Sequence, residues 1–288
     1  MKTINKKEFN KYIFSNIKET VLNYNLIEED ELIAVALSGG KDSVLTLYAL
    51  NQLKKDNKIP NFKLIAISVD EGIKHYRNHG LETARQISNE LEIKLVEKSF
   101  KEEFKYELDD IYSYFKSACI VCGIFRRTIL NKTAHNLGVD KLATGHNLDD
   151  EIQSFLMSFA RGDTIKFSKF GPKLNRIHPK LTPRIKPLWN LPEKDVGTWA
   201  VLNDINIHLD ECPYSYLSLR SKIKNFLNQT ESKNKGTKRN IMESFKKTFN
   251  ITPPKANLKE CQLCGEPCSG DICKTCETLK IIKAQKKL

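Results

Sequence analysis

The sequence has no long apolar run, no internal repeat and no cysteine before Cys119. No apolar stretch approaches the roughly 20 residues that a helix needs to cross a bilayer. The charged opening MKTINKKEFNKYIFSNIKET also lacks the apolar core of a signal peptide. We therefore expect a cytoplasmic protein with no membrane partner. Its 288 residues, 40% of them hydrophobic, are enough for a full-sized core and for more than one domain.

The eight cysteines that are present fall into two sets. The first set is Cys119, Cys122 and Cys212. The other five lie close together in the segment CQLCGEPCSGDICKTC, at positions 261, 264, 268, 273 and 276. In a cytoplasmic chain, C-x-x-C pairs indicate metal binding or redox chemistry rather than structural disulfides.

The C-terminal set has the spacing of a zinc ribbon. Four thiolates in two short turns suit tetrahedral Zn²⁺. The predicted ligands are Cys261, Cys264, Cys273 and Cys276, and Cys268 is predicted not to be a ligand.

Positive charge is concentrated in one stretch. The formal net charge is +12, which a lysine-rich composition alone would partly explain. Between Arg220 and Glu260, however, eleven Lys and Arg stand against three Glu, a net charge of +8. This concentration favours a polyanionic partner.

Apolar runs alternate with helical patterns through the first half of the chain. We predict strands at 32–37, 64–69, 93–100 and 140–145, and helices at 6–24, 42–55, 78–91, 122–137 and 149–160. This alternation predicts an α/β fold, a doubly wound parallel sheet covered on both faces. Residues 163–187 are expected to form a loop, 193–203 and 216–228 two more helices, and ITPP at 251–254 a linker. The expected division is 1–28 (helical extension), 29–215 (catalytic domain), 216–255 (basic helical region and linker) and 256–288 (zinc ribbon).

The segment ALSGGKDS at 36–43 joins the first predicted strand to a helix. It matches neither GxxxxGK[ST] nor GxGxxG. Two glycines still let the backbone turn close to a ligand, two hydroxyls are available, and the helix start offers free N–H groups. An ordinary tight turn with a helix cap is the alternative. The predicted phosphate ligands are Ser38, Gly39, Gly40, Lys41, Asp42 and Ser43.

Two further segments follow predicted strands, ISVDEGI at 67–73 and ATGHNLDDE at 143–151. Ligands of open α/β sheets bind at the carboxyl ends of strands. Paired aspartates there suit Mg²⁺ between phosphates, and they would equally cap the following helix. The candidate nucleotide-binding residues in these segments are Val69, Asp70, Gly145, His146, Asp149 and Asp150.

The motif S-G-G-x-D-S resembles the PP-loop of the ATP pyrophosphatases. Together, CxxCGxxRR, GHNLDDE, RIKPL at 184–188 and ECPYS closely resemble the TtcA/TtuA family of tRNA thiolases, which includes the cytosolic wobble-uridine thiolation proteins. The resemblance runs from about residue 30 to residue 280. It implies that ATP is cleaved to AMP and pyrophosphate, that a uridine C2 oxygen is adenylated, and that sulfur then replaces this oxygen.

The resemblance also implies roles for individual residues. Cys119, Cys122 and Cys212 match three cysteines that hold a [4Fe-4S] cluster, although a persulfide pair or a zinc site remains open. Asp150 matches an aspartate near the reacting centre. Arg126 stands where some thiolases of the T-loop uridine carry lysine, which favours the wobble branch. Arginine cannot act as a base, so its implied role is to hold α-phosphate or adenylate charge.

Several alternatives stay open at this point. The implied partners are tRNA, a sulfur donor (a ubiquitin-like carrier or free sulfide) and a second copy of the chain. Thiolation of the T-loop uridine or of cytidine would use the same chemistry. A tRNA-binding scaffold with an inert ATP fold, or an amidotransferase-like or lysidine-type enzyme, would leave the cysteines without a role. The zinc ribbon would either help to dock tRNA or only stabilise the end of the fold. Many relatives begin with another zinc ribbon, which this chain lacks.

Overall fold

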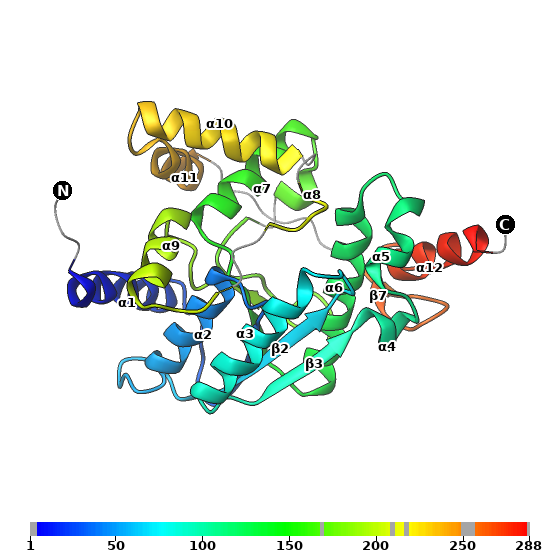
Figure 1. Ribbon diagram of the computed structural model, residues 1–288, viewed down its shortest axis with the longest axis horizontal. Coiled ribbons are helices and arrows are strands. Elements are labelled where there is room, and N and C mark those ends of the chain that lie inside the picture. Colours follow the sequence, from blue (N-terminus) through cyan, green and yellow to red (C-terminus); the bar gives the residue numbers. More distant parts are fainter. Residues whose placement is uncertain (1–4, 168–169, 208–210, 216–218, 249–256, 287–288) are drawn as a thin grey trace.

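A computed structural model describes residues 5–167, 170–207, 211–215, 219–248 and 257–286 (Figure 1). The predicted linker at 251–254 lies outside these residues. Among the described helices, none combines the length and the apolarity that crossing a membrane requires.

A five-stranded sheet with the order β3-β2-β1-β4-β5 forms the centre of the molecule, and all of its pairs are parallel. The strands are β1 (Glu31–Ala36), β2 (Phe62–Asp70), β3 (Leu95–Ser99), β4 (Lys141–Ala143) and β5 (Arg184–Ile185). This confirms the predicted doubly wound α/β fold. The chain moves outward from β1 to β3 and then returns to β4 on the other side of β1. The carboxyl ends of β1 and β4 therefore meet at a topological switch point, where ligands of such sheets bind.

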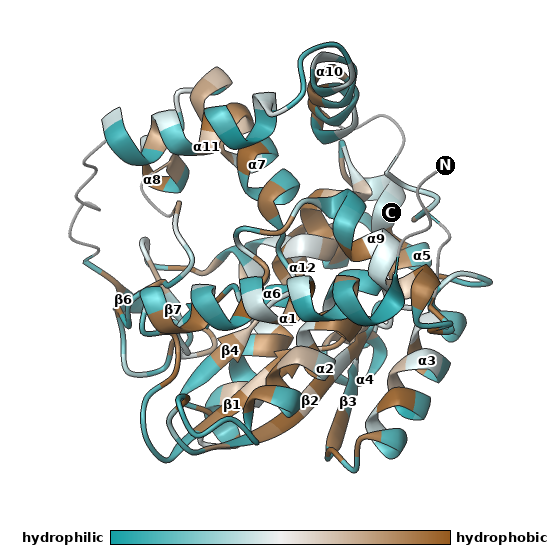
Figure 2. Ribbon diagram, turned by 90° about the vertical axis from the view of Figure 1, so that its left-hand side faces the viewer, coloured by the Kyte–Doolittle hydropathy of each residue, from teal (hydrophilic) through white to brown (hydrophobic). Residues whose placement is uncertain are grey.

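Strand β1 is buried on both faces, as a central parallel strand should be. Its residues alternate between two cores: Ile33 and Val35 belong to one, and Ala34 to the other. The first core is covered by α1 (Lys6–Asn23), α2 (Lys41–Leu53), α3 (Arg77–Glu90) and α9 (Glu193–Leu202). The second is covered by α4 (Phe100–Phe104), α5 (Leu108–Ile111), α6 (Ala118–Asn136) and α12 (Lys274–Gln285). Figure 2 shows the strands as the hydrophobic centre between these helices.

Two basic helices form a further layer above the switch point. α10 (Leu219–Lys233) and α11 (Thr237–Thr248) pack on α7 (Leu148–Ala160), as Figure 1 shows. Leu227 and Met242 are buried there against Leu148 and Ile152. The part of the positively charged stretch that forms α10 and α11 therefore lies over the edge of the sheet where the phosphate loop ends.

Several predicted elements need correction. The fourth main helix, α6, begins at Ala118 rather than at 122, because Ser117 takes an extended conformation and ends the preceding loop. Cys119 and Cys122 therefore both lie on this helix, about one turn apart. The expected loop at 163–187 contains α8 (Thr164–Phe167) and the edge strand β5. Helices α11 and α12 and the 3-10 turn at Tyr112–Tyr114 were not predicted as elements.

The C-terminal segment packs on α6. It consists of a hairpin, β6 (Lys259–Glu260) and β7 (Pro267–Cys268), followed by α12. Ile282 of α12 is fully buried in the second core, and the hydroxyls of Thr128 and Thr275 lie 2.7 Å apart. Lys180 Nζ donates to the carbonyl of Gly265 at 3.0 Å. The segment is thus fastened to the helix that carries Cys119 and Cys122.

Candidate active site

The SGGKDS loop turns between β1 and α2 and is held by its own hydroxyls. Ser43 Oγ donates to the Gly40 carbonyl at 3.0 Å and accepts from the Ser38 amide at 3.1 Å. The Ser38 and Ser43 hydroxyl oxygens lie 3.1 Å apart. Gly40 is the N-cap residue of α2 and provides no side-chain cap. The first amides of α2 are therefore free to meet an anion, as phosphate loops require.

Gly39 explains why the loop needs glycine. Its φ is +85°, and an added Cβ would lie 2.0 Å from the carbonyl oxygen of Gly80 in α3. Both the left-handed conformation and the close approach of α3 exclude a side chain. Gly145, which follows β4, is similarly tight, because an added Cβ would lie 2.7 Å from the carbonyl carbon of Asp42.

Arg77 fastens the loop to the end of β2, and nothing in the sequence pattern singled it out. Its Nη1 donates to the Ser38 carbonyl at 2.5 Å, and its Nε donates to the Val69 carbonyl at 2.8 Å. It also forms an ion pair with Glu71 at 2.8 Å, and both side chains are buried. A buried cation with this set of partners acts as a rigid brace. Of the predicted nucleotide residues, Val69 supplies a backbone acceptor here, and Asp70 Oδ1 accepts from the Gly72 amide at 2.9 Å.

Asn147 connects the GHNLDDE segment to the phosphate loop. Its side chain caps α7 by accepting from the Asp150 amide at 3.1 Å, and it donates to Asp42 Oδ1 at 2.8 Å. His146 lies in the same turn, with Nδ1 2.8 Å from the hydroxyl of Thr144. Burial and the nearby cations Lys186, Arg220, Arg184 and Arg126 lower the pKa of His146 to about 3, so this imidazole is neutral.

The two predicted Mg²⁺ aspartates are in contact with cations of the helical layer. Asp149 Oδ1 pairs with Lys238 of α11, while its Oδ2 accepts from the Glu193 amide at 2.8 Å. Asp150 Oδ1 pairs with Arg220 of α10 at 3.1 Å. Burial, together with the charge of Asp42, nevertheless raises the pKa of Asp150 to about 6. The cationic partners lie 70 and 89 residues away along the chain, so no local pattern predicts them.

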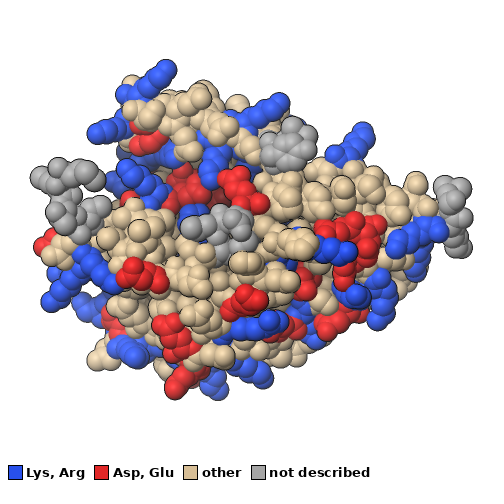
Figure 3. All heavy atoms as spheres, in the orientation of Figure 1, with Lys and Arg blue, Asp and Glu red and all other residues tan. Residues whose placement is uncertain are grey.

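A recess lies between the α10–α11 layer and the sheet. Figure 3 shows acidic side chains gathered in it below α10, with Lys and Arg side chains beside them. Lys41 and Lys224 both contact Glu193, at 3.1 and 3.0 Å. Lys186 is paired with Glu151 at 2.8 Å, and both are buried. The predicted phosphate loop, His146, Asp149 and Asp150 all face this one region.

The three cysteines of the first set are brought together from two segments. Cys119 and Cys122 lie in the first turns of α6, and the Cys119 thiol is 3.7 Å from the carbonyl oxygen of Tyr214, two residues after Cys212. The Tyr214 hydroxyl donates to Asp109 Oδ1 at 2.7 Å, which holds the second segment in place. Burial raises the pKa of the Cys122 thiol to about 12, and the charges of Glu71, Cys212 and Cys119 add to this effect.

The donor set fits an iron–sulfur cluster better than a zinc ion. Cys122 and Cys212 pack against the apolar core beside Ile124, an environment in which a thiol loses its proton only when a metal or a cation stabilises the thiolate. The only multi-ligand group found among the described residues is the C-terminal one, so no fourth Cys, His or carboxylate completes a compact single-ion site here. Three thiolates without a fourth protein ligand suit a four-iron cluster with one open iron.

Glu71 joins the cysteine region to the phosphate loop. One carboxylate oxygen meets Arg77, and the other meets Arg126 of α6 at 3.4 Å. The side chain of Arg126 is half exposed, yet its surroundings desolvate it, and the charges of Cys122 and Glu71 raise its pKa. Through Glu71, Arg126 on the helix that carries the cysteines is linked to Arg77 and so to the phosphate loop.

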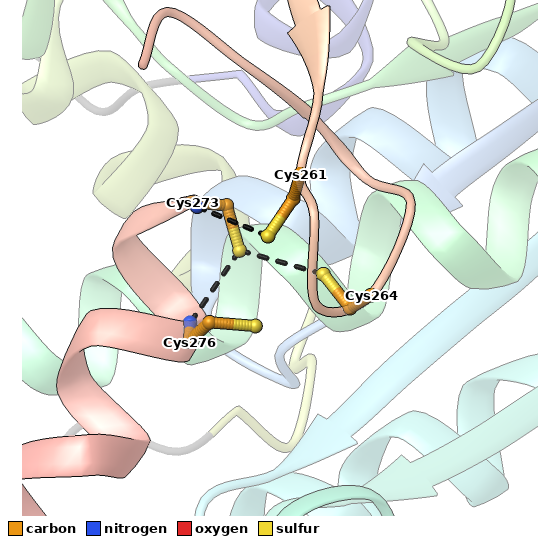
Figure 4. A group of neighbouring side chains, drawn as sticks. All are labelled: Cys261, Cys264, Cys273 and Cys276. Atoms are coloured by element: carbon orange, nitrogen blue, oxygen red, sulfur yellow. Dashed lines mark hydrogen bonds between the residues drawn. The ribbon is translucent and has the colours of Figure 1, made fainter. Parts of the chain in front are cut away.

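The C-terminal cysteines form a compact four-sulfur group (Figure 4). The sulfur atoms of Cys261, Cys264, Cys273 and Cys276 all lie within 4.8 Å of one another and point toward a common centre. Tetrahedral Zn–S bonds would set them roughly 3.8 Å apart. The Cys273 amide donates to Cys261 Sγ at 3.2 Å and lowers its pKa to about 6. Cys268 lies outside the group and donates to the Gly270 carbonyl.

Comparisons with known proteins agree with this geometry. Residues 8–231 match a model of the PP-loop domain. A probable sulfurtransferase of Methanocaldococcus jannaschii is 37% identical over 91% of this chain and 78% of its own. The tRNA-5-methyluridine(54) 2-sulfurtransferase of Pyrococcus horikoshii is 32% identical over 94% of this chain and 86% of its own. Among solved structures, the U34-tRNA thiolase NcsA from Methanococcus maripaludis with its [4Fe-4S] cluster has 35% sequence identity to this chain. The two structures superimpose with a TM-score of 0.81 over 96% of this chain and 88% of that one.

Proposed function

Because the chain belongs to the PP-loop family of tRNA sulfurtransferases, we propose that it makes 2-thiouridine at the wobble position of tRNA. The observation that carries this proposal is the position of Glu71. Glu71 contacts Arg77, which braces the phosphate loop, and it also contacts Arg126 on α6, the helix that carries Cys119 and Cys122. The nucleotide loop and the cysteines therefore serve one reacting centre.

The phosphate loop would bind the leaving group. The amides at the start of α2 and the hydroxyls of Ser38 and Ser43 point to where pyrophosphate would form, and the helix end favours its charge. The uridine C2 oxygen attacks the α-phosphorus, the bond to the β-phosphate oxygen breaks, and an adenylated base results. Arg126 would neutralise the charge that develops at the α-phosphate, since a guanidinium remains charged throughout.

We assign Mg²⁺ to Asp149 and Asp150. Lys238 and Arg220 contact the same carboxylates, so the metal would compete with these two cations. Displacing them would link metal binding to the α10–α11 layer, where a tRNA would meet the basic helices.

Cys119, Cys122 and Cys212 would hold the [4Fe-4S] cluster, and Arg126 and Glu71 would border it. When bound, the cluster would supply an iron with a free coordination position at which sulfur can be held. Displacement of AMP from C2 by sulfide completes the replacement of oxygen by sulfur. We propose either free sulfide or a thiocarboxylated carrier protein as the donor, and Zn²⁺ as the occupant of the C-terminal cysteine group.

The identity of residue 126, an arginine, favours thiolation of the wobble uridine over thiolation of the T-loop uridine. The cysteine helix carries arginine where some thiolases of the T-loop uridine carry lysine, and a compact ammonium and a planar guanidinium place charge differently. Thiolation of the T-loop uridine, or of a cytidine, is the second candidate. A scaffold with an inert ATP fold is not favoured, since the loop keeps both glycines and both hydroxyls.

One assay tests the proposal. Protein reconstituted without oxygen is supplied with ATP, Mg²⁺, sulfide and two tRNA transcripts, one with uridine and one with cytidine at the wobble position. We expect 2-thiouridine by mass spectrometry from the first transcript only, and AMP with pyrophosphate by chromatography. Thiouridine from both transcripts would move the target to another position, and ADP with orthophosphate would remove the PP-loop chemistry.

Three cysteine variants complete the test. Cys119→Ala, Cys122→Ala and Cys212→Ala should each abolish thiolation while the fold is retained, and Cys268→Ala, which lies outside both cysteine groups, is the matched control. Thiolation that survives any of the first three would contradict the assigned ligand set.

A further inference from the structure

Arg127 follows Arg126 on α6, but its side chain lies against Gly123 rather than against Glu71. An added Cβ at Gly123 would lie 3.1 Å from Nη1 of Arg127 and 3.2 Å from its Nη2. The guanidinium is therefore folded back over Gly123, one helical turn toward the end of α6 that carries Cys122. Glycine at 123 leaves the space that this group occupies.

Two hydrogen bonds of Asn131 show which segment lies beside Arg127. Asn131 Nδ2 donates to the Lys180 carbonyl at 2.8 Å, and Asn131 Oδ1 accepts from the Thr182 amide at 3.0 Å. Since α6 leads back to the start of β4, it runs antiparallel to the strands. Arg127 precedes Asn131 by one helical turn, about 6 Å along the helix axis. Arg184 follows Thr182 by two residues, about 6.6 Å along the strand in the same direction. The two guanidinium groups thus come from neighbouring positions.

Neither arginine has an anionic partner in the described part of the chain, where both lack a hydrogen bond and an ion pair from the side chain. Partial desolvation and repulsion from Arg127 and Arg126 lower the pKa of Arg184 to about 10, and partial desolvation and Arg126 lower that of Arg127. By contrast, the buried cations Lys141 and Lys186 are paired with Glu31 and Glu151, each at 2.8 Å. Arg127 is exposed and Arg184 is half-buried, so these two adjacent unpaired arginines are open to an anion from solvent.

We propose that Arg127 and Arg184 form a binding site for one backbone phosphate of the tRNA, next to the nucleotide to be thiolated. This rests on the proposed function. A phosphodiester has two free oxygens, which suit two guanidinium forks better than a single ammonium. The Arg127 guanidinium lies against Gly123, the residue after Cys122, so the site borders the cysteines. A nucleotide carries its base and its phosphate one sugar apart, and phosphate contacts set the position in which a base is presented.

Binding of a wobble-uridine transcript by fluorescence anisotropy, over a range of salt concentrations, tests the site directly. Loss of one phosphate contact should lower the slope of log affinity against log salt by about one, and the affinity about fivefold at physiological salt. We expect this of Arg127→Gln and of Arg184→Gln, and no larger change of slope in the double variant, because both serve one phosphate. Arg85→Gln is the matched control, since Arg85 is exposed and paired with Glu97.

A second experiment moves the Arg127 guanidinium without removing its charge. Gly123→Ala places a methyl group 3.1 Å from Nη1 of Arg127, so the guanidinium must shift slightly, and alanine suits a helix interior. Thiolation should fall severalfold through misplacement of the substrate, with the salt slope nearly unchanged. Gly197→Ala in α9 is the control, because nothing lies within 4 Å of its added Cβ. The visible spectrum of each variant reports whether the cluster is still bound.

The outcomes separate this proposal from the proposed function. If the unaltered protein thiolates tRNA and both arginine variants keep its slope and rate, the site is wrong and the function stands. A slope that falls by two in the double variant means two separate phosphates and overturns the shared site. The arginine variants could instead bind tRNA normally, lose sulfur transfer from a thiocarboxylated carrier and keep transfer from free sulfide. That result would assign the arginines to the donor's carboxylate and overturn the proposal. If the unaltered protein does not thiolate, the function itself fails.

Discussion

The Asn147 side chain donates to Oδ1 of Asp42 across 2.8 Å and at the same time accepts from the amide of Asp150 at 3.1 Å. One buried amide group, 2% exposed, therefore joins the first turn of α2 to the first turn of α7. These are the two helices that begin at the switch point of the sheet. The distance between the phosphate loop and the carboxylates of α7 depends on this contact.

Asn147→Ala should lower the free energy of unfolding by about 1–2 kcal/mol, because it removes a helix cap and leaves Oδ1 of Asp42 without its hydrogen-bond donor. Urea unfolding measures the loss, and ATP affinity should fall with it. Asn5→Ala is the control: Asn5 caps the exposed start of α1, so stability should fall slightly while ATP affinity stays the same. Equal effects on ATP binding from both variants would contradict the bridging role of Asn147.

The two loop glycines should respond differently to alanine. Gly39 has a positive φ, and its added Cβ would meet backbone at 2.0 Å, so Gly39→Ala should unfold the loop and lower the melting temperature. Gly40 has φ −80°, and its nearest neighbour would be the Ser38 hydroxyl at 3.6 Å. Gly40→Ala should therefore fold normally. Calorimetry of both variants decides the point, and a Gly39→Ala protein with unchanged stability would contradict it.

The sequence predicted those parts of the site whose signals are local. Gly39, Gly40 and Ser43 follow a buried strand within a few residues, and glycine spacing is visible without any knowledge of packing. Cys261 to Cys276 are recognisable for the same reason. The group's geometry, four sulfurs within 4.8 Å, confirms the prediction that these cysteines come together.

The parts that the sequence did not predict depend on long-range packing. Arg77 braces the loop only because α3 lies against the end of β2, and its segment has no motif. The pairing of Lys238 with Asp149 requires α11 to fold over α7. The start of α6 was predicted four residues late, because its apolar pattern begins after Cys122 while its N-cap at Ser117 has no side-chain cap bond.

The pH dependence of stability should reveal Asp150. Its pKa is raised by burial and by Asp42, so the folded state binds this proton more tightly than the unfolded chain does. The free energy of unfolding should then fall as pH rises from about 4 to about 6, and this cost persists at neutral pH. Asp150→Asn should therefore stabilise the nucleotide-free protein by about 1–2 kcal/mol at pH 7, and by nothing below pH 4.

The neighbouring aspartate is the control for that measurement. Asp149 is buried and paired with Lys238, whose side chain is 14% exposed. Asp149→Asn leaves this lysine without its counter-charge, so stability should fall rather than rise. Denaturant unfolding of both variants between pH 4 and pH 8 tests the opposite signs. Two losses of equal size would mean that the Arg220 contact outweighs the burial of Asp150.

The C-terminal cysteines offer the last test, which concerns stability as well as metal. Cys276 lies in the first turn of α12, and the same helix buries Ile282 against the core that contains α6. Loss of Zn²⁺ should therefore loosen α12 and its contact between Thr275 and Thr128, and lower the melting temperature. We expect Cys276→Ala to reduce the zinc content from one equivalent to nearly none. The iron chromophore should remain, because its proposed ligands lie in other segments.

Cys268 provides the control for this test. Its thiol donates to the Gly270 carbonyl, so Cys268→Ala should keep both zinc and stability. Elemental analysis and thermal unfolding of the two variants decide the point, and equal zinc loss from both would overturn the assignment of the four ligands.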